Sequence, residues 1–431
     1  MGFRDGQIPT EQKMKELKRV VVTGLGALTP VGNNVSDTWQ ALVEGKNGVG
    51  QITQFDAALF KTQFAAEVKG FDPSALLDRK EAHRMDRYAQ FSVWVAKEAM
   101  NDSKLDLEKE NHERMGVIWG SGMGGLKTFE TEFIEYAKGD GTPHFNPFYI
   151  PKVILSIGAG HISLMFKLKG PSYAVSSACA SSSHAIAQAF DHIRMGHADV
   201  ILTGGAEAAV TPSGIGGFNA MHALSSRNDS PETACRPFSA SRDGFVLGEG
   251  AACLVLEEYE HAIARGAKIY AEMAGEGMTS DAYHLTAPDP DGYGAQRVMK
   301  MALEDAGLHP EDIDYINTHG TSTPLGDIAE LHAIQEVFGE HAYKMNLDST
   351  KSMTGHLLGA TGAVEAMATV LALHNGVIPP TINHTDEDED PKIDYRLNLT
   401  FGKAQKRNIR YALSNTFGFG GHNACLAFKK A

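Results

Sequence analysis

Residues 170–190 read GPSYAVSSACASSSHAIAQAF, and this stretch decides how the rest of the chain is interpreted. A strand-like segment gives way, through small residues, to an alanine-rich helical pattern, with Cys179 at the change. A thiol at a helix N-terminus lies near unpaired backbone N–H groups and the positive end of the helix dipole, which lower its pKa. Cys179 is therefore a candidate nucleophile, although a cysteine among small residues is by itself more often an inert core residue.

Strand and helix patterns alternate on both sides of this stretch. Such alternation indicates an α/β fold with helices covering the faces of a sheet. The second half of the chain repeats the logic of the first, so two similar α/β halves are expected. The strand patterns cover residues 19–23, 114–119, 173–175, 201–205, 250–257, 314–318 and 423–429, and the helix patterns cover 181–194, 327–338 and 360–374.

Composition excludes several classes of protein. The 431 residues, 42% of them hydrophobic, can bury one large core or two medium ones. The apolar runs are much shorter than the roughly 20 residues of a membrane span. The start of the chain is polar and lacks the apolar stretch of a secretory signal, which favours a cytoplasmic protein. Because Met14 looks like a natural start, residues 1–13 are interpreted as a leader, a cloning remnant or an extension.

Charge and cysteine content argue against a nucleic-acid partner, a disulfide framework and a zinc site. A formal net charge of −14 argues against a nucleic-acid partner. Cys179, Cys235, Cys253 and Cys425 show neither C-x-x-C pairing nor metal spacing, so neither a disulfide framework nor a zinc site is expected. The acidic run at 386–390 is interpreted as a solvated loop without chemistry.

Two histidines strengthen the case for Cys179. In NTHGTSTPLGD, His319 follows a strand pattern and precedes Thr321 and Thr323, whose hydroxyls can bond an amide-bearing substrate arm. In STKSMTGHLLGATGAVEA, His356 precedes a long helical pattern. Either histidine alone could equally be structural, but together with Cys179 they form a Cys-His-His set at junctions where α/β folds place reactive groups.

Two charged residues flank His356 in sequence, and a glycine-rich segment closes the chain. Lys351 and Glu365 could set the protonation and orientation of the histidines, although a surface lysine and a helix glutamate are the commoner reading. The segment SNTFGFGGHNA permits sharp turns and close approach of backbone to a ligand.

Together these motifs closely resemble the β-ketoacyl-acyl-carrier-protein synthases of type II fatty acid synthesis. The resemblance implies an acyltransferase with a thiolase-like fold, in which two pseudo-repeated halves form a five-layer α-β-α-β-α core. The halves would be residues 18–268 and 269–431, after an N-terminal extension at 1–17, in a homodimer. The similarity runs from about residue 18 to 430 and includes RVVVTGLGALTPVGN, GPSYAVSSACASSSHAI, GGAEAA, RPFSASRDGFVLGEGA, SDAYHLTAPDP, HGTSTPLGD, KSMTGHLLGATGAVEA and SNTFGFGGHNA.

The same resemblance implies a role for each matching residue. Cys179 would accept the acyl group, and His319 and His356 would assist malonyl decarboxylation. Phe417 would be a mobile gate, and its backbone N–H with that of Cys179 would form the oxyanion hole. The remaining matches are Lys351 and Glu365 as supporting charged residues, Thr321 and Thr323 for the phosphopantetheine arm, Met123 and Phe218 for the acyl pocket, and Asn317, Glu365, Ser414 and Asn415 for the monovalent cation, Na⁺ or K⁺, of some relatives.

The chain departs from the family pattern at several positions. Ser182 stands where a glycine is common, so the packing of its helix is expected to differ slightly. Lys80 and Arg84 are expected to bind the acidic acyl carrier protein. That patch is expected to be weaker or differently arranged, because His83, Pro143, His144 and His222 occupy positions that are basic in well-known relatives.

The implied reaction is a ping-pong Claisen condensation, in which decarboxylation of malonyl-carrier-protein drives extension of the Cys179-bound acyl chain by two carbons. It requires no metal or redox cofactor, and the phosphopantetheine arm belongs to the carrier. A thiolase would need a second catalytic cysteine, for which only Cys425 is available. A type III starter synthase would have Asn in place of His356, a chain-length partner would lack the nucleophile, and a cysteine hydrolase would not need the HGTST loop. The preferred acyl chain, and a fatty acid or polyketide carrier, stay open.

Overall fold

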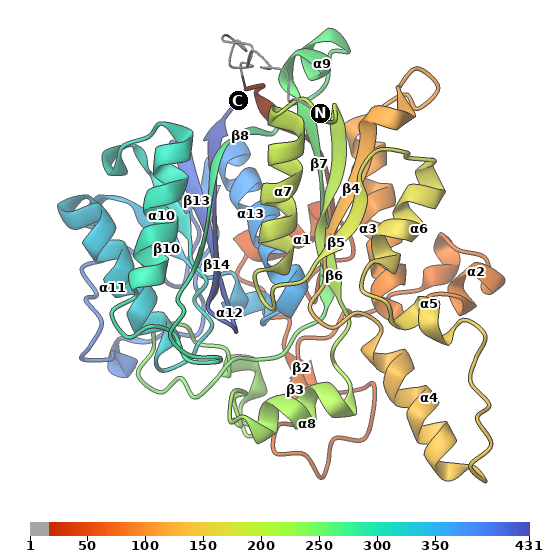
Figure 1. Cartoon of the computed structure of the whole chain (residues 1–431). Coiled ribbons are helices and arrows are strands. Elements are labelled where there is room, and N and C mark those ends of the chain that lie inside the picture. The colour runs from red at the N-terminus through yellow and green to blue at the C-terminus, as the bar shows by residue number, and fades with distance from the viewer. Residues whose placement is uncertain (1–16) are drawn as a thin grey trace, which may run out of the picture.

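Ten strands of the chain are hydrogen-bonded into one sheet, and each half of that sheet forms one of the two β layers of the molecule (Figure 1). The computed structural model describes residues 17–431, so the predicted N-terminal extension, apart from its last residue, lies outside the described range. The strands of the first half are β1 (Val20–Leu28), β4 (Met115–Gly120), β5 (Ser172–Val175), β6 (Val200–Glu207) and β7 (Gly250–Glu258). Those of the second half are β8 (Ala271–Ser280), β9 (Tyr315–Asn317), β10 (Asn346–Asp348), β13 (Tyr411–Gly418) and β14 (His422–Lys430).

The two halves have the same strand order. It runs β5-β4-β6-β7-β1 in the first half and β10-β9-β13-β14-β8 in the second. In both, therefore, the first strand of the half is innermost and the third lies at the outer edge. The halves join where residues 20–22 of β1 pair antiparallel with residues 271–273 of β8. The predicted pseudo-repeat is confirmed, whereas the division between residues 268 and 269 stays a prediction.

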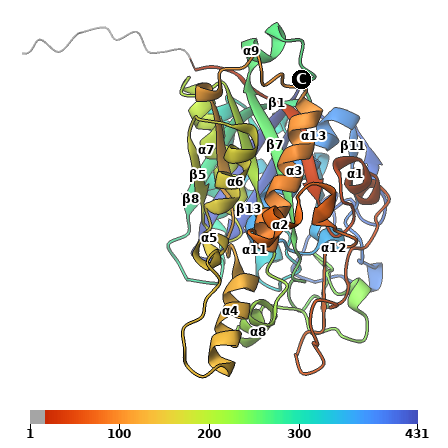
Figure 2. The same cartoon turned by 90° about the vertical axis from the view of Figure 1, so that its right-hand side faces the viewer.

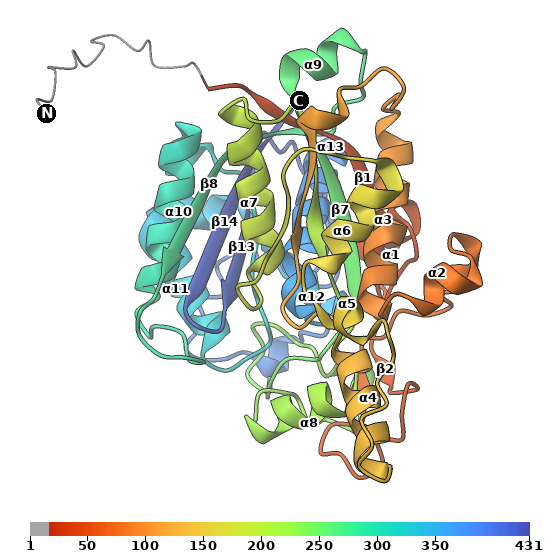
Figure 3. The ribbon, with the colours of Figure 1, turned by 45° about the vertical axis from the view of Figure 1, so that its right-hand side comes forward.

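Helices complete a five-layer arrangement. Between the two halves lie α7 (Ser181–Arg194), which packs on β4 and β6, and α13 (Thr361–Asn375), which packs on β7 and β13. Outside the first half lie α3 (Arg87–Ser103) and α6 (Ile157–Phe166), and outside the second lie α10 (Tyr293–Ala306) and α11 (Gly326–Phe338). Figure 3 shows α7 in front of the central strands, with α10 and α3 on opposite sides. The predicted α-β-α-β-α layering is confirmed.

Burial explains the uniform hydrophobicity of the central elements. Every residue of β1, β6 and β7 is buried, as expected for strands covered on both faces. In α13, residues 361–373 are all buried, so this helix has no polar face and belongs to the interior. Among residues 17–431, no helix combines the length and apolar character that crossing a membrane requires.

The predicted effect of Ser182 on helix packing has a local explanation. Ser182 is fully buried, and its hydroxyl accepts the backbone N–H of Ala363 in α13 at 2.9 Å. Gly120 and Gly205 face it, and a Cβ at Gly205 would lie only 2.8 Å from Cβ of Ser182. The serine therefore fits because both facing strand residues lack side chains.

Shorter elements lie at the ends of the layers. Figure 1 shows α4 and α8 below the layered core, and Figure 2, turned by 90°, shows α1, α2 and α3 along one side. The bounds are α1 (Val35–Val43), β2 (Gly50–Gln51), β3 (Phe64–Ala65), α2 (Arg79–His83), α4 (Leu126–Lys138), α5 (Tyr149–Val153), α8 (Pro212–Ala220), α9 (Tyr259–Ala264), α12 (Lys351–Thr354), β11 (Val377–Ile378) and β12 (Gln405–Lys406).

The acidic run at 386–390 is not simply a solvated loop. Asp388 accepts the backbone N–H of Ser241 at 2.8 Å and pairs with Arg236 at 3.4 Å. Asp390 pairs with Arg242 at 2.9 Å. The sequence interpretation is therefore wrong for these two residues, because the run folds back onto arginines that precede it by about 150 positions.

Candidate active site

The turn that carries Cys179 connects β5 to α7. Cys179 lies two residues before the first residue of α7, as the sequence predicted. The preceding residue, Ala178, has φ 52°, a left-handed conformation that a non-glycine residue adopts only under constraint. That constraint comes from Ser181, whose hydroxyl donates to the carbonyl of Ala178 at 2.6 Å and accepts the N–H of Ser177 at 2.9 Å. The turn presents the sulfur to the cavity described below.

The predicted lowering of the thiol pKa is wrong for this site. Burial raises the pKa of Cys179 to about 11. The nearby charge of Lys351 and a hydrogen bond from the backbone N–H of Phe419 act in the opposite direction but are smaller. Desolvation therefore outweighs the effect of the helix N-terminus, and the resting nucleophile is a thiol.

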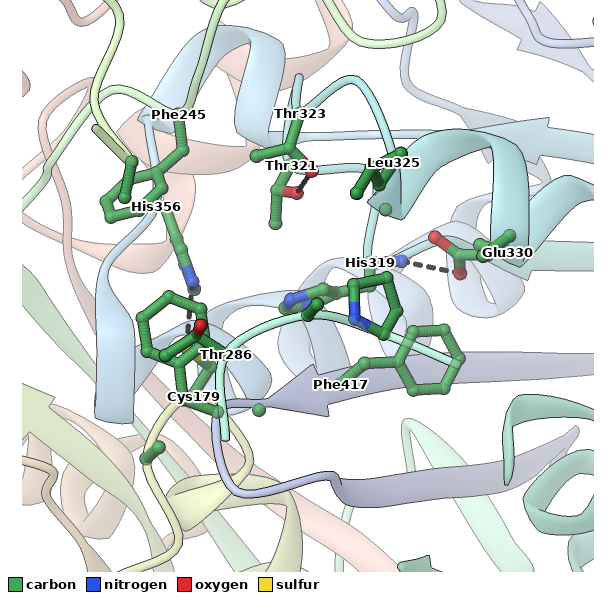
Figure 4. Close-up of a pocket in the computed structure, with 18 of the residues that line it drawn as sticks. Cys179, Phe245, Thr286, His319, Thr321, Thr323, Leu325, Glu330, His356 and Phe417 are labelled. Carbon is green, nitrogen blue, oxygen red and sulfur yellow. Dashed lines mark hydrogen bonds between the residues drawn. The ribbon is translucent and has the colours of Figure 1, made fainter. Parts of the chain in front are cut away.

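His356 lies directly against this thiol. Its Nε2 is 3.0 Å from Sγ of Cys179 (Figure 4). Its Nδ1 is 2.8 Å from Oγ1 of Thr361. Burial, together with the charge of Lys351, holds the pKa of His356 well below its usual value. The imidazole is neutral, and when Nδ1–H donates to Thr361, Nε2 can accept the thiol proton.

His319 occupies the same cavity without touching the sulfur. The ring centroids of His319 and His356 are 5.3 Å apart, with the planes nearly perpendicular. The backbone N–H groups of His319 and Gly320 each donate to Glu330 at 2.8 Å. Nδ1 of His319 is buried and has no hydrogen-bond partner within residues 17–431. Burial lowers the pKa of His319 well below its usual value, so its ring is neutral and can form a hydrogen bond with a substrate.

Lys351 and Glu365 form a buried ion pair beside these rings. Their side chains are only 1% and 2% exposed, and Nζ of Lys351 contacts Oε1 of Glu365. Burial raises the pKa of Glu365 to about 8, although Lys351 opposes that shift. The charge of Lys351 also disfavours protonation of His319 and His356. Lys351 therefore helps to keep both histidines neutral.

A cavity of about 800 Å³ connects these groups to the surface. One wall is apolar, where Phe218 packs on Phe245 with ring centroids 5.3 Å apart. Another carries the hydroxyls of Thr321 and Thr323, which bond each other at 2.9 Å. The cavity thus offers an apolar wall for an acyl chain and hydroxyls for a polar arm. Its predicted lining residues include Cys179, Phe218, His319, Thr321, Thr323, His356 and Phe417.

Comparisons with known proteins agree with this geometry. The model of the Beta-ketoacyl synthase, N-terminal domain, matches residues 17–262, and that of the Beta-ketoacyl synthase, C-terminal domain, matches residues 270–385. The chain belongs to the β-ketoacyl synthase family. It is 51% identical to 3-oxoacyl-[acyl-carrier-protein] synthase 2 of Synechocystis sp. over 96% of this chain and 99% of that one. The Coxiella burnetii protein of the same name is 49% identical over the same shares. A solved β-ketoacyl synthase from Burkholderia phymatum superposes with a TM-score of 0.88 at 38% identity, over 96% of this chain and 100% of that one.

Other predicted residues of the synthase lie outside the cavity. Met123 is 39% exposed and is not among the lining residues, although its neighbour Gly122 is. Lys80 and Arg84 lie exposed on α2 and at its C-terminal end, with the guanidinium of Arg84 5.0 Å from the ring of Phe148. Met123 is thus not among the residues that line this cavity, and its place in the acyl pocket stays a prediction. Both docking residues are accessible.

The glycine-rich segment of the synthase brings Phe417 and a backbone N–H to the site. Phe417 lines the cavity, 5.7 Å from the ring of His319, but it belongs to β13, where it pairs with Asn423 of β14. The N–H that bonds the sulfur is that of Phe419. This group lies two residues beyond Phe417 because β13 continues through Gly418 before the chain turns, and the donor of the oxyanion hole stays a prediction.

The residues predicted to hold a monovalent cation fit that role. Asn317, Glu365, Ser414 and Asn415 are at most 2% exposed, and each has a buried side-chain oxygen without a hydrogen-bond partner in the described chain. Such oxygens are costly to bury unless something satisfies them. Amide, hydroxyl and carboxylate oxygens are suitable ligands for a hard cation.

Sequence reasoning missed two buried carboxylates of the synthase. Glu330 anchors the His319 loop as described above. Glu207, fully buried, accepts the backbone N–H groups of Gly122, Met123 and Gly359 at 2.8–3.0 Å. Burial raises the pKa of both carboxyl groups to about 7. No local pattern distinguishes these acids from exposed ones, because their importance arises only from the backbone that surrounds them.

Proposed function

We propose that the chain is a 3-oxoacyl-[acyl-carrier-protein] synthase that acts through an acyl-enzyme on Cys179. The observation that carries the proposal is the contact between the thiol of Cys179 and the neutral imidazole of His356, with His319 in the same cavity. The names of the relatives support the same reaction class.

The first half-reaction loads the acyl chain. The thiol proton of Cys179 passes to Nε2 of His356, and the sulfur attacks the carbonyl carbon of the acyl thioester. The backbone N–H groups of Cys179 and Phe419 are the donors proposed for the developing oxyanion. The carbon–sulfur bond to the carrier then breaks, the departing thiolate takes up the proton, and the acyl group stays on Cys179.

The second half-reaction extends the chain. The bond between the carboxylate and Cα of the malonyl group breaks, carbon dioxide leaves, and the electron pair forms an enolate. Its oxygen accepts hydrogen bonds from His319 and from Nε2–H of His356, in the tautomer whose Nδ1 accepts the hydroxyl of Thr361. Cα then attacks the acyl carbonyl on Cys179, and the sulfur leaves as a thiolate that takes up one proton from solvent. Neutral rings suit this step, because they can donate a hydrogen bond without holding a fixed charge. The product is a 3-oxoacyl chain two carbons longer.

The proposed partner is an acyl carrier protein. The names of the relatives contain it, and a solved ketosynthase with a TM-score of 0.87 and 34% identity is described in complex with its acyl-carrier protein. Lys80 and Arg84 would meet the acidic carrier, and Thr321 and Thr323 its phosphopantetheine arm. No cofactor is proposed for the chemistry. A structural Na⁺ or K⁺ is proposed at the site formed by Asn317, Glu365, Ser414 and Asn415. We also propose a cytoplasmic location.

We further propose that the synthase is a homodimer. β5 is an edge strand that pairs only with β4 in the described chain. Apolar side chains are exposed on α6, which packs on β5, and on α4, among them Leu164 at 77%, Phe129 at 47% and Phe133 at 44%. A second copy that covers them would bury an edge and an apolar surface at once. Light scattering that gives the mass of one chain would contradict this.

The reaction is tested by the intact mass of the protein. Incubation with a medium-chain acyl-carrier-protein should add one acyl group, and malonyl-carrier-protein should then remove it. Cys179→Ala should gain no mass, whereas Cys253→Ala should behave like the parent because Cys253 lies within β7 and does not line the cavity. No adduct over a range of chain lengths would contradict the acyl-enzyme.

A further inference from the structure

Arg242, in the motif RPFSASRDGFVLGEGA, is not one of the catalytic residues, but each nitrogen of its guanidinium donates hydrogen bonds within the protein. Its side chain is 1% exposed. Nε donates to the carbonyl of Thr323 at 3.1 Å, and Nη2 donates to that of Pro324 at 2.9 Å. Nη1 donates to the carbonyl of Ser239 at 2.6 Å and to Asp390 at 2.9 Å. One planar guanidinium thus donates hydrogen bonds to two successive carbonyls of the loop that follows His319.

That loop, residues 321–325, is held under constraint. Ser322 has φ 65°, a left-handed conformation that costs free energy for a non-glycine residue. Asp327, fully buried, accepts the N–H of Ser322 at 3.1 Å and lies 3.5 Å from Nε of Arg242. The strained loop therefore persists because Arg242 and Asp327 fix both sides of it.

The outer end of this network comes from the acidic run. Asp390 is 14% exposed and is the partner that Arg242 reaches toward the surface. It lies beyond residue 385, where the match to the C-terminal synthase domain ends. The run therefore connects the last part of the chain, through Arg242, to the loop that carries the two threonine hydroxyls.

We propose that Arg242 is a positioning residue that holds Thr321 and Thr323 where they bind the pantetheine arm of the substrate, with Asp390 fixing the guanidinium from outside. The inference rests on the proposed function. Lysine cannot replace the guanidinium, because a single ammonium cannot address two adjacent carbonyls and a carboxylate in one plane.

The test compares two substrates that share one acyl chain. Acyl-pantetheine carries the whole arm, whereas the acyl thioester of N-acetylcysteamine keeps only its terminal amide. The rate of Cys179 acylation, followed by intact mass, gives kcat/KM for each. In the parent protein the ratio of the two values should favour pantetheine, and in Arg242→Lys the ratio should fall about tenfold or more, the cost of losing charge-assisted hydrogen bonds.

Arg236→Lys is the matched control. The Arg236 side chain bonds Thr233, Ser241 and Asp388 but makes no bond to residues 321–325. In Arg236→Lys, the ratio of kcat/KM for acyl-pantetheine to that for the N-acetylcysteamine thioester should equal the parental ratio. Asp390→Asn leaves the guanidinium in place and should lower the ratio of the two kcat/KM values by a smaller factor. If Arg242→Lys does not fold, this variant tests the positioning role.

The outcomes separate the two hypotheses. If the parent is acylated but the ratio is the same in Arg242→Lys, or both substrates slow by one factor, the positioning role is overturned. A parent that shows no preference for pantetheine overturns it too. If the parent is acylated by neither substrate nor by an acyl-carrier-protein, the proposed function itself fails.

Discussion

Sγ of Cys179 and Nε2 of His356 lie 3.0 Å apart, although 177 positions separate the two residues. Burial shifts their two pKa values away from each other, that of the thiol upward and that of the imidazole downward. The resting pair is thus thiol and imidazole rather than thiolate and imidazolium. Attack on a thioester therefore requires proton transfer within the pair as the substrate carbonyl arrives.

The protonation state of the pair is open to direct measurement. Because the pKa of Cys179 is raised to about 11, its alkylation by iodoacetamide should accelerate about tenfold per pH unit from pH 7 to 9 without levelling near the ordinary thiol value of about 8.5. Mass spectrometry of the alkylated protein gives the rate, and Cys179→Ala corrects for the other cysteines. A plateau below pH 8 would indicate an ion pair instead.

The two histidines should separate by half-reaction. His356 touches the sulfur and His319 does not, so His319→Ala should keep acylation within about threefold while malonyl decarboxylation falls about 10²- to 10⁴-fold. His356→Ala should impair both. Carbon dioxide release and acyl-enzyme mass report the two steps. The matched control is His332→Ala on α11, 49% exposed. Equal loss of acylation in His319→Ala and His356→Ala would refute the division.

Thermal unfolding tests the cation site. Na⁺ or K⁺ that binds only the folded protein should raise Tm by about 1–3 °C relative to choline at equal ionic strength. Ser414→Ala removes one of the free oxygens and should abolish the difference. Thr203→Val removes a buried free hydroxyl elsewhere and should preserve it. If all three proteins respond equally to Na⁺, K⁺ and choline, these residues bind no cation.

Charge reversal tests carrier docking. Lys80→Glu with Arg84→Glu should raise KM for acyl-carrier-protein about tenfold at low salt, and less at high salt, because exposed charges are screened. Acyl-pantetheine, which lacks the carrier, should react at the parental rate. Lys300→Glu, an exposed residue of α10, is the control. An equal effect on both substrates would point to a disturbed active site rather than a docking surface.

Local pattern was sufficient for the fold and the family. The helix at residues 181–194 has the predicted limits, and Cys179 lies at its start, because the change from strand-like to alanine-rich sequence is a local signal. The ordered motifs identified the β-ketoacyl synthase family and reaction class, which the comparisons confirm. They also indicated Asn317, Glu365, Ser414 and Asn415, whose free oxygens the structure brings into the interior.

The amino-acid sequence by itself thus determined the layered α/β class, seven of the ten strands of the sheet and the set of reactive side chains, but its strand patterns did not include β8, β10 or β13. Only the tertiary structure decided how those side chains behave. The thiol pKa rises, the N–H of Phe419 bonds the sulfur, Met123 is not among the residues that line the cavity, and Asp390 pairs with Arg242. Desolvation and hydrogen bonding depend on which distant segments pack together, and a one-dimensional pattern carries no measure of that packing.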